Sequence, residues 1–176
     1  MIIGLFLSGI IIWLAGAVAS LALWRKPVAA RRVACAAALA GSIFDLSASA
    51  FAIFSSSPSV IGLPFGNPVF SWAVRIDPLS AYFNVTLGVL AAAVSLYSLG
   101  YLREMEGRRN LGAFGFFFNL LLMSLALVFT ASNVFFFLVA WEVMAHNLGP
   151  FVKSLLSLFP KTKKAAPQTT NAPTSG

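Results

Sequence analysis

The fold is decided by residues 111–152, LGAFGFFFNLLLMSLALVFTASNVFFFLVAWEVMAHNLGPFV. This run is apolar except for a short break at Ser132 and Asn133 and a few polar residues near its end. As a single helix it would be roughly 60 Å long at 1.5 Å per residue, twice the thickness of the hydrocarbon core of a bilayer. We therefore predict two membrane-spanning helices, over 111–131 and 134–152, joined by a tight turn.

Three further apolar stretches of similar length lie upstream, at 2–24, 33–54 and 78–102. The chain of 176 residues is 59% hydrophobic and only 10% charged, far from the roughly 25% charged residues of soluble domains. The prediction is an all-α polytopic membrane protein with a transmembrane helical domain over 1–152.

Asp77-Pro78 supplies an N-cap and a first-turn proline for the third helix. Residues 55–76, rich in Ser, Pro and Gly, are expected to form a loop, and 153–176 a basic, disordered tail.

The basic residues predict the orientation of the chain. Of 12 Lys and Arg residues, 11 fall on one side of this topology, between helices one and two, between three and four, and after helix five. Arg75 alone lies on the other side. The positive-inside rule then places the N-terminus outside and the C-terminus in the cytoplasm. Because the charge lies in loops and not on a basic face, we expect no nucleic-acid partner.

Two of the five acidic residues lie inside predicted spans. Glu142 is in the middle of helix five and Asp45 near the middle of helix two. An acid at such depth costs about 2.5–3.5 kcal/mol on insertion scales and often marks a proton or ion path. Glu142 is the main candidate for proton translocation, with a structural, hydrogen-bonded acid as the alternative. Asp45, flanked by serines, is a weaker candidate, since a packing role is equally compatible with its sequence.

His146 follows Glu142 by four residues and is therefore on the same helical face, where it could relay a proton. A solvated histidine at the membrane interface is the simpler interpretation. No phosphate-binding loop, serine nucleophile elbow or metal-ligand spacing occurs, and the single Cys35 cannot form an intramolecular disulfide. The phenylalanines at 116–118 and 135–137 are interpreted as packing or lipid-facing groups in preference to a quinone site. We expect no catalytic residue, cofactor or metal, and no autonomous catalysis.

Four ordered blocks of sequence, at 74–81, 95–107, 115–120 and 141–144, resemble the antiporter-like membrane subunits of respiratory complex I, Mrp antiporters and membrane-bound hydrogenases, with the hydrogenase-4 type the most similar. The resemblance covers approximately residues 1–145. It implies that the glutamate matched by Glu142 pairs with a lysine on a later helix, which modulates its proton affinity. It also implies a prokaryotic plasma membrane, and partner subunits of a hydrogenase or quinone-reductase complex that carry the redox chemistry.

The chain departs from this family after Ala145. The resemblance implies about fourteen helices in two inverted repeats, each with a lysine on a broken helix, whereas this sequence continues into His146-Asn147-Leu148-Gly149-Pro150 and the basic tail. We therefore expect the N-terminal part of a proton-translocating subunit, truncated and inactive alone. The alternatives are a structural membrane protein or degraded gene fragment without transport and, third, a small autonomous antiporter using Asp45 and Glu142.

Overall fold

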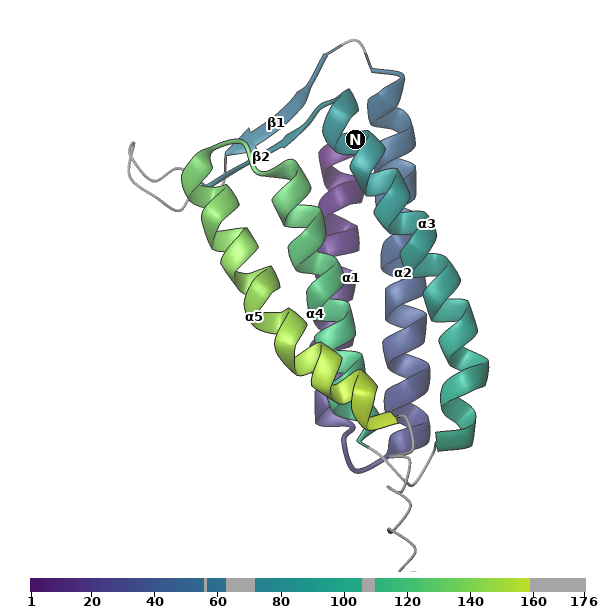
Figure 1. The fold of residues 1–176 in the computed structure, drawn as a ribbon. Coiled ribbons are helices and arrows are strands. Elements are labelled where there is room, and N and C mark those ends of the chain that lie inside the picture. The colour runs from purple at the N-terminus through teal and green to yellow at the C-terminus, as the bar shows by residue number, and fades with distance from the viewer. Residues whose placement is uncertain (56, 63–71, 106–109, 159–176) are drawn as a thin grey trace, which may run out of the picture.

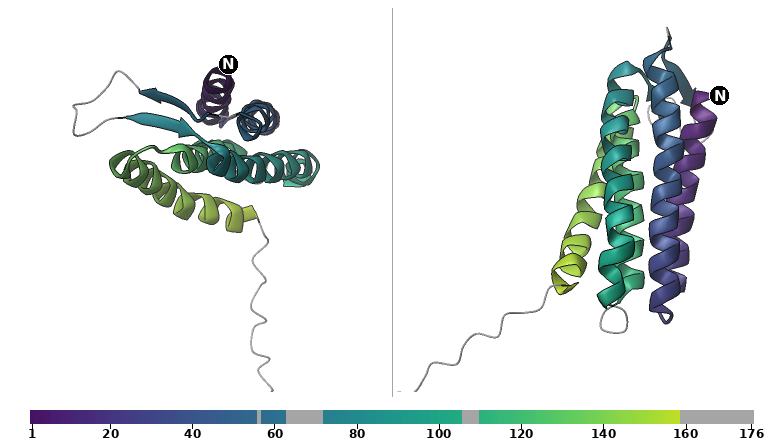
Figure 2. Two further views of the ribbon diagram at one scale, coloured as in Figure 1. Left: turned by 90° about the horizontal axis from the view of Figure 1, so that it is seen from above. Right: turned by 90° about the vertical axis from the view of Figure 1, so that its right-hand side faces the viewer.

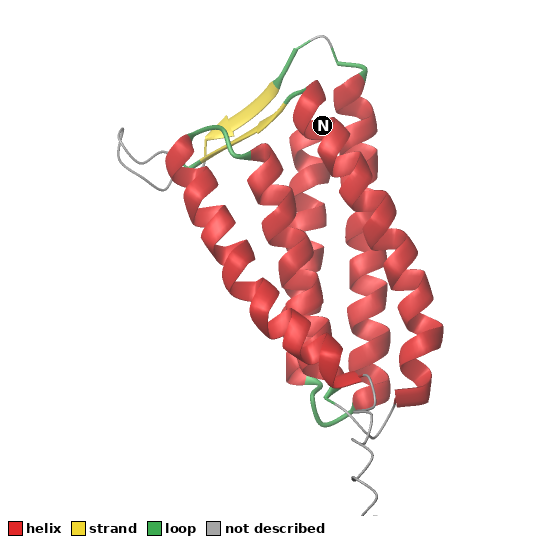
Figure 3. Cartoon of the chain, viewed as in Figure 1, coloured by secondary structure: helices red, strands yellow, loops and turns green. Residues whose placement is uncertain are grey.

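Five long helices and one short hairpin make up the computed structural model, which describes residues 1–55, 57–62, 72–105 and 110–158 (Figures 1 and 3). The elements are α1 (Ile2–Ala22), α2 (Pro27–Ile53), β1 (Ser59–Gly62), β2 (Ala73–Ile76), α3 (Pro78–Tyr101), the 3₁₀-helix η1 (Leu102–Met105), α4 (Leu111–Thr130) and α5 (Val134–Leu158). All five α-helices are long and apolar enough to cross a membrane. The predicted all-α polytopic membrane protein is thus confirmed.

The helices pack in layers (Figure 2). The first two, α1 and α2, lie side by side, and the layer of α3 and α4 covers them, with α3 against α2 and α4 against α1. The last helix, α5, packs mainly on α4 and lies at the outside of the bundle. One face of α5 is therefore left without a protein neighbour in the part of the chain that the structure describes.

Two helix boundaries lie six residues from the predicted ones, while the others agree within two residues. The second helix begins at Pro27 and not at residue 33, and Pro27 takes the first helical turn, where its missing N–H costs nothing. Arg31 and Arg32 therefore lie within α2, because a helix can extend past the hydrocarbon into the polar headgroup region. The fifth helix passes through Pro150 and ends at Leu158, six residues beyond the predicted end of the transmembrane domain. Most of the predicted tail, 159–176, lies outside the described residues.

The segment expected to be a loop at 55–76 contains a small antiparallel sheet. Ser59 pairs with Ile76 and Gly62 with Ala73, and the intervening residues 63–71 lie outside the described part of the chain. The hairpin also reaches the turn between α4 and α5, through a bridge from Val74 to Ala131 and a hydrogen bond from the Ser132 N–H to the Ala73 carbonyl at 3.1 Å. It thereby ties the α2–α3 connection to the α4–α5 connection at one end of the bundle (Figure 1).

Close packing of α1 on α2 centres on Trp13, whose side chain is fully buried. Its indole Nε1 donates to the Ala38 carbonyl at 3.2 Å. The ring lies against Gly41, where a Cβ would come within 2.4 Å of Nε1. The absence of a side chain at Gly41 is therefore what admits the indole between the two helices.

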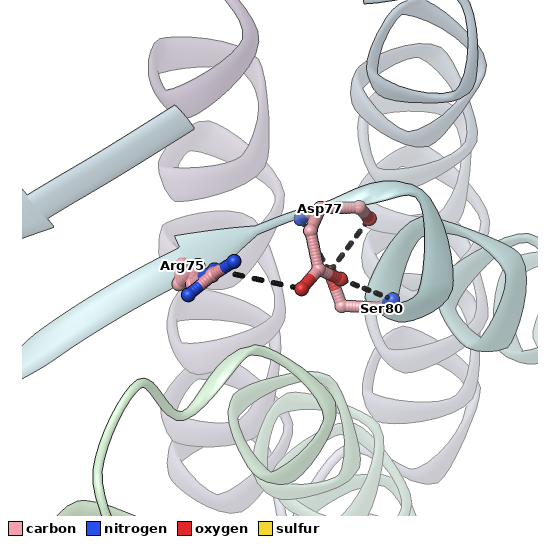
Figure 4. A network of polar contacts seen from close by, with 3 residues as sticks. All are labelled: Arg75, Asp77 and Ser80. Carbon is pink, nitrogen blue, oxygen red and sulfur yellow. Dashed lines mark hydrogen bonds and ion pairs between the residues drawn. The ribbon is translucent and has the colours of Figure 1, made fainter. Parts of the chain in front are cut away.

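The predicted N-cap of the third helix is confirmed. Asp77 Oδ1 accepts from the Ser80 N–H at 2.9 Å, and Ser80 Oγ accepts from the Asp77 N–H at 2.9 Å, while Arg75 Nε lies 3.5 Å from Asp77 Oδ2 (Figure 4). The hydrogen bond from the Ser80 backbone holds the pKa of Asp77 below its usual range, and the Ser80 hydroxyl and Arg75 act in the same direction. This reciprocal capping box fixes where the chain leaves the hairpin and enters the membrane.

We expect Asp77→Ala to lower the free energy of unfolding by about 1 kcal/mol at pH 7, the usual value of an N-cap. Asp77→Asn is the control, because asparagine caps equally well without a charge. Since the carboxyl pKa is lower in the folded state, the charged cap stabilises the fold above the unfolded pKa of about 3.9 and is lost as the pH falls through the folded value. Unfolding in mixed micelles at pH 7 and pH 3 measures both effects. An equal loss in Asp77→Ala at the two pH values would contradict the role of the charge.

Candidate functional site

Glu142, the main sequence candidate, lies on the exposed side of α5. It is surrounded by apolar residues of the same helix, which line a shallow groove: Phe135, Leu138, Val139, Trp141 and Val143. On the opposite side of this helix Asn147 is buried. Counting 1.5 Å per residue, Glu142 is about 12 Å along α5 from Val134, well inside the span. An acid at this depth needs a protein or water neighbour, so the Glu142 face is a place where further protein is expected.

His146 is also exposed and stands one turn after Glu142 on α5. At this spacing the two Cβ atoms are about 5–6 Å apart, within reach of a shared proton. The relay role of His146 stays a prediction, because no contact between the two side chains is seen.

Asp45 occupies the opposite environment. Its side chain is 1% exposed, and neither carboxyl oxygen has a hydrogen-bond partner in the described structure. It lies between α2 and α3 beside Gly88, where a Cβ would be 3.5 Å from Asp45 Oδ2 and 2.7 Å from Leu46 Cγ. Glycine at position 88 thus lets the backbone of α3 pack closely on Leu46, beside the carboxyl group of Asp45.

The buried faces of α2 and α3 carry several more polar residues. Arg31 NH1 donates to the Leu99 carbonyl near one end of this pair of helices, which run antiparallel. Farther along, the Ser42 and Ser95 hydroxyls donate to carbonyls one turn back on their own helices. The other buried polar residues on the two helices are Asp45, Ser49, Ser80, Asn84 and Ser98. A polar interface inside apolar spans is typical of membrane helix pairs, where small polar side chains allow close approach.

Two buried asparagines were not singled out from the sequence. Asn84 Nδ2 donates to the Ser80 carbonyl at 3.0 Å, and its Oδ1 has no partner. Asn119 Nδ2 donates to the Ala34 carbonyl at 3.1 Å and to the Gly115 carbonyl at 3.0 Å, which joins α4 to α2. An uncharged amide costs less free energy to insert into a membrane than an acid does, so it is a weaker sign of a functional site. A single Asn among apolar residues is nevertheless the sequence feature that could have revealed both Asn84 and Asn119.

The structure does not bring the two intramembrane acids together. Asp45 is enclosed between α2 and α3, whereas Glu142 faces away from the bundle on α5. Among the described residues, no three His, Cys, Asp or Glu side chains lie close enough to hold a metal ion. The phenylalanines interpreted as packing groups differ in their surroundings: Phe118 is buried and stacks on Phe114 and Phe151, while Phe116 and Phe117 are half-buried.

The fold and its intramembrane acids define the class: an all-α polytopic membrane protein. Residues 63–111 match the family model described as NADH-Ubiquinone oxidoreductase (complex I), chain 5 N-terminus. Together with similarity to curated relatives, this match supports the antiporter-like family of membrane subunits as the relatives of this chain.

Three relatives illustrate this similarity. Hydrogenase-4 component B of Escherichia coli (strain K12) is 38% identical over 81 residues, which are 44% of this chain and 12% of the relative. Formate hydrogenlyase subunit 3 of the same strain is 30% identical over 105 residues, 60% of this chain and 16% of the relative. NADH-quinone oxidoreductase subunit L of Mycobacterium tuberculosis (strain CDC 1551 / Oshkosh) is 32% identical over 80 residues, 46% of this chain and 12% of the relative. The matched part of the chain thus spans between 12% and 16% of these relatives.

Proposed function

We propose that this chain forms the first five membrane helices of a proton-translocating subunit in a hydrogenase-4 or complex I type assembly. Electron transfer takes place in partner subunits, and Glu142 takes up and releases the translocated proton. The subunit lies in the plasma membrane of a prokaryote, with its N-terminus outside and its C-terminus in the cytoplasm. Similarity to subunits of hydrogenase and quinone-reductase complexes supports the type of assembly.

The observation that carries this proposal is the position of Glu142 on the open face of α5. Leu138 and Trp141 on this face are about half exposed, as expected of a helix that packs on further protein within the membrane. A carboxyl group there can exchange a proton with a neighbour, whereas the buried Asp45 is shielded by its own helices. Of the sites in the described structure, the Glu142 face therefore fits a path that continues into other helices.

Among the described residues, Glu142 forms no ion pair with a lysine or arginine. Lysines occur at positions 26, 153, 161, 163 and 164. Lys26 precedes α2, and Lys153 is about 16 Å farther along α5 than Glu142, counting 1.5 Å per residue. We propose that a basic partner for Glu142 comes from the protein that covers α5, and that the chain alone does not translocate protons.

Native affinity purification tests the assembled role. An affinity tag at the C-terminus, followed by extraction in mild detergent, is expected to recover hydrogenase or quinone-reductase subunits with the chain. Trp141→Ala, on the open face of α5, should weaken this recovery several-fold, because buried aromatic anchors dominate interfaces. Tyr82→Ala, on the exposed side of α3, is the matched control. Recovery of the chain without partners, and its rapid turnover in cells, would favour the alternative of a structural protein or remnant.

A further inference from the structure

A second acidic site, separate from the Glu142 face, lies between α2 and α3. Asp45 and Asn84 are each 1% exposed, and three of their oxygen atoms have no hydrogen-bond partner: both carboxyl oxygens of Asp45 and Oδ1 of Asn84. Gly88 stands one turn after Asn84 on the same face of α3, and a Cβ there would be 3.5 Å from Asp45 Oδ2. Two acceptor groups without a hydrogen-bond partner are therefore buried at this helix interface, Asp45 beside position 88 of α3 and Asn84 one turn before that position.

An ionised carboxylate can only accept hydrogen bonds, and an amide oxygen can only accept them as well. Between two such groups a donor is required, because a buried polar atom without a partner is costly. A proton on Asp45 turns its carboxyl group into a donor and removes its charge at once. The amide nitrogen of Asn84 has two N–H donors, of which one is bonded to the Ser80 carbonyl, and neither reaches Asp45, whose carboxyl oxygens have no hydrogen-bond partner.

Among the described residues, no lysine, arginine or histidine forms an ion pair with Asp45 that would hold it in its charged form. The segments of α1, α3 and α4 contain no Asp, Glu, Lys, Arg or His. The nearest basic groups on α2, Arg31 and Arg32, are about 20 Å along the helix, and Arg31 is bonded to Leu99. On α1, Gly9 lies beside the Asp45 backbone, and the Met1 amine is about 12 Å along that helix from Gly9. The other charged or titratable groups on or next to these elements include Arg75, which pairs with Asp77, and, with no printed contact to Asp45, Arg25, Lys26, Cys35, Tyr82, Tyr97, Tyr101 and Arg103.

We propose that Asp45 and Asn84 form a proton-binding site between α2 and α3, in which Asp45 carries a proton at neutral pH and donates it in a hydrogen bond toward the Asn84 amide oxygen. The ligand of this site is a single proton. Gly88 lets α3 pack closely on α2 beside the carboxyl group, since a Cβ there would come within 2.7 Å of Leu46 Cγ. The chain then holds two acids of different kinds: Asp45, protonated and enclosed, and Glu142, open to a neighbour.

Infrared spectroscopy of the full chain in lipid vesicles tests this directly, because the carbonyl stretch of a protonated carboxyl is separate from that of a carboxylate. The chain has only two aspartates, Asp45 and Asp77, so ¹³C-carboxyl aspartate labels two groups. Asp77 is ionised at pH 7, since its pKa is lowered. We expect an isotope-shifted protonated-carboxyl band at pH 7 in the unmodified sequence. Absence of such a band would overturn the proposal without requiring any variant to fold.

Three variants refine the assignment. Asp45→Asn should remove the isotope-shifted band, and Glu142→Gln should leave it unchanged. Asn84→Leu should keep the band but shift its frequency, because the acceptor is lost; an unshifted band would show that Asn84 does not receive the proton. An isotope-shifted band that survives Asp45→Asn would assign it to Asp77 and also overturn the proposal. None of these readouts depends on partner subunits or on proton flux, so the result stands apart from that of the proposed function.

Discussion

Replacing Trp13 with alanine is expected to lower the free energy of unfolding by about 3 kcal/mol, the lower end of the range for buried Trp→Ala changes. The side chain is fully buried between α1 and α2, and its indole N–H donates to the Ala38 carbonyl. In a membrane the transfer of apolar atoms out of water contributes less, because lipid is the surrounding solvent. The variant still loses packing contacts, the hydrogen bond to Ala38 and the fit against Gly41. We therefore expect a loss in the free energy of unfolding at the lower end of the range for buried Trp→Ala changes.

Trp24→Ala is the matched control, since Trp24 is 59% exposed just after α1. Unfolding followed in mixed micelles should show a large loss for Trp13→Ala and a change within about 0.5 kcal/mol for Trp24→Ala. Equal losses in the two variants would mean that the packing of α1 on α2 does not depend on the indole in this way.

Most of the fold could be predicted because the membrane imposes a simple length rule. Runs of about 20 apolar residues marked all five helices, and the break at Ser132 and Asn133 marked the turn before α5. The start of α2 was predicted six residues late, because Arg31 and Arg32 were taken as the limit of the helix. The limit of the hydrocarbon and the limit of the hydrogen-bonded helix are different physical boundaries, and charged residues mark only the first.

The hairpin at 59–76 was not predicted, because strands of four residues carry little periodic signal. One of its strands also forms a bridge to Ala131, which is distant in sequence. Proline and glycine in this segment correctly excluded a helix but said nothing about which residues pair.

The candidate residues of the site could be chosen from the sequence, but their surroundings could not be predicted. Glu142 and Asp45 stood out because acids are rare in spans, yet Asp45 proved to be enclosed and Glu142 open. In a soluble helix the polar face would have revealed this difference. In a membrane helix the lipid-facing and protein-facing sides are both apolar, so orientation depends on which helices pack together. That information is not contained in the sequence of one helix.

Replacing Glu142 with glutamine is expected to have the largest effect on function. Glutamine keeps the size and the hydrogen-bonding capacity of the side chain but cannot give up a proton at neutral pH. If the translocated proton passes through Glu142, its loss should reduce proton flux by at least about tenfold, equivalent to ~1.4 kcal/mol in the barrier. Glu142→Asp is the matched control, because it retains an acid on the same face of α5 and should keep a measurable part of the flux.

The measurement is proton flux into vesicles that contain the complex purified with this chain, driven by the electron-transfer reaction of the partner subunits, with vesicles of the chain alone prepared in parallel. We predict proton flux in the unmodified complex and only background flux for the chain alone. With Glu142→Gln, the proton flux should fall by at least about tenfold, while electron transfer is either unchanged or slowed in step with the flux. Unchanged flux in the Glu142→Gln complex would contradict the account, as would strong Glu142-dependent flux through the chain alone.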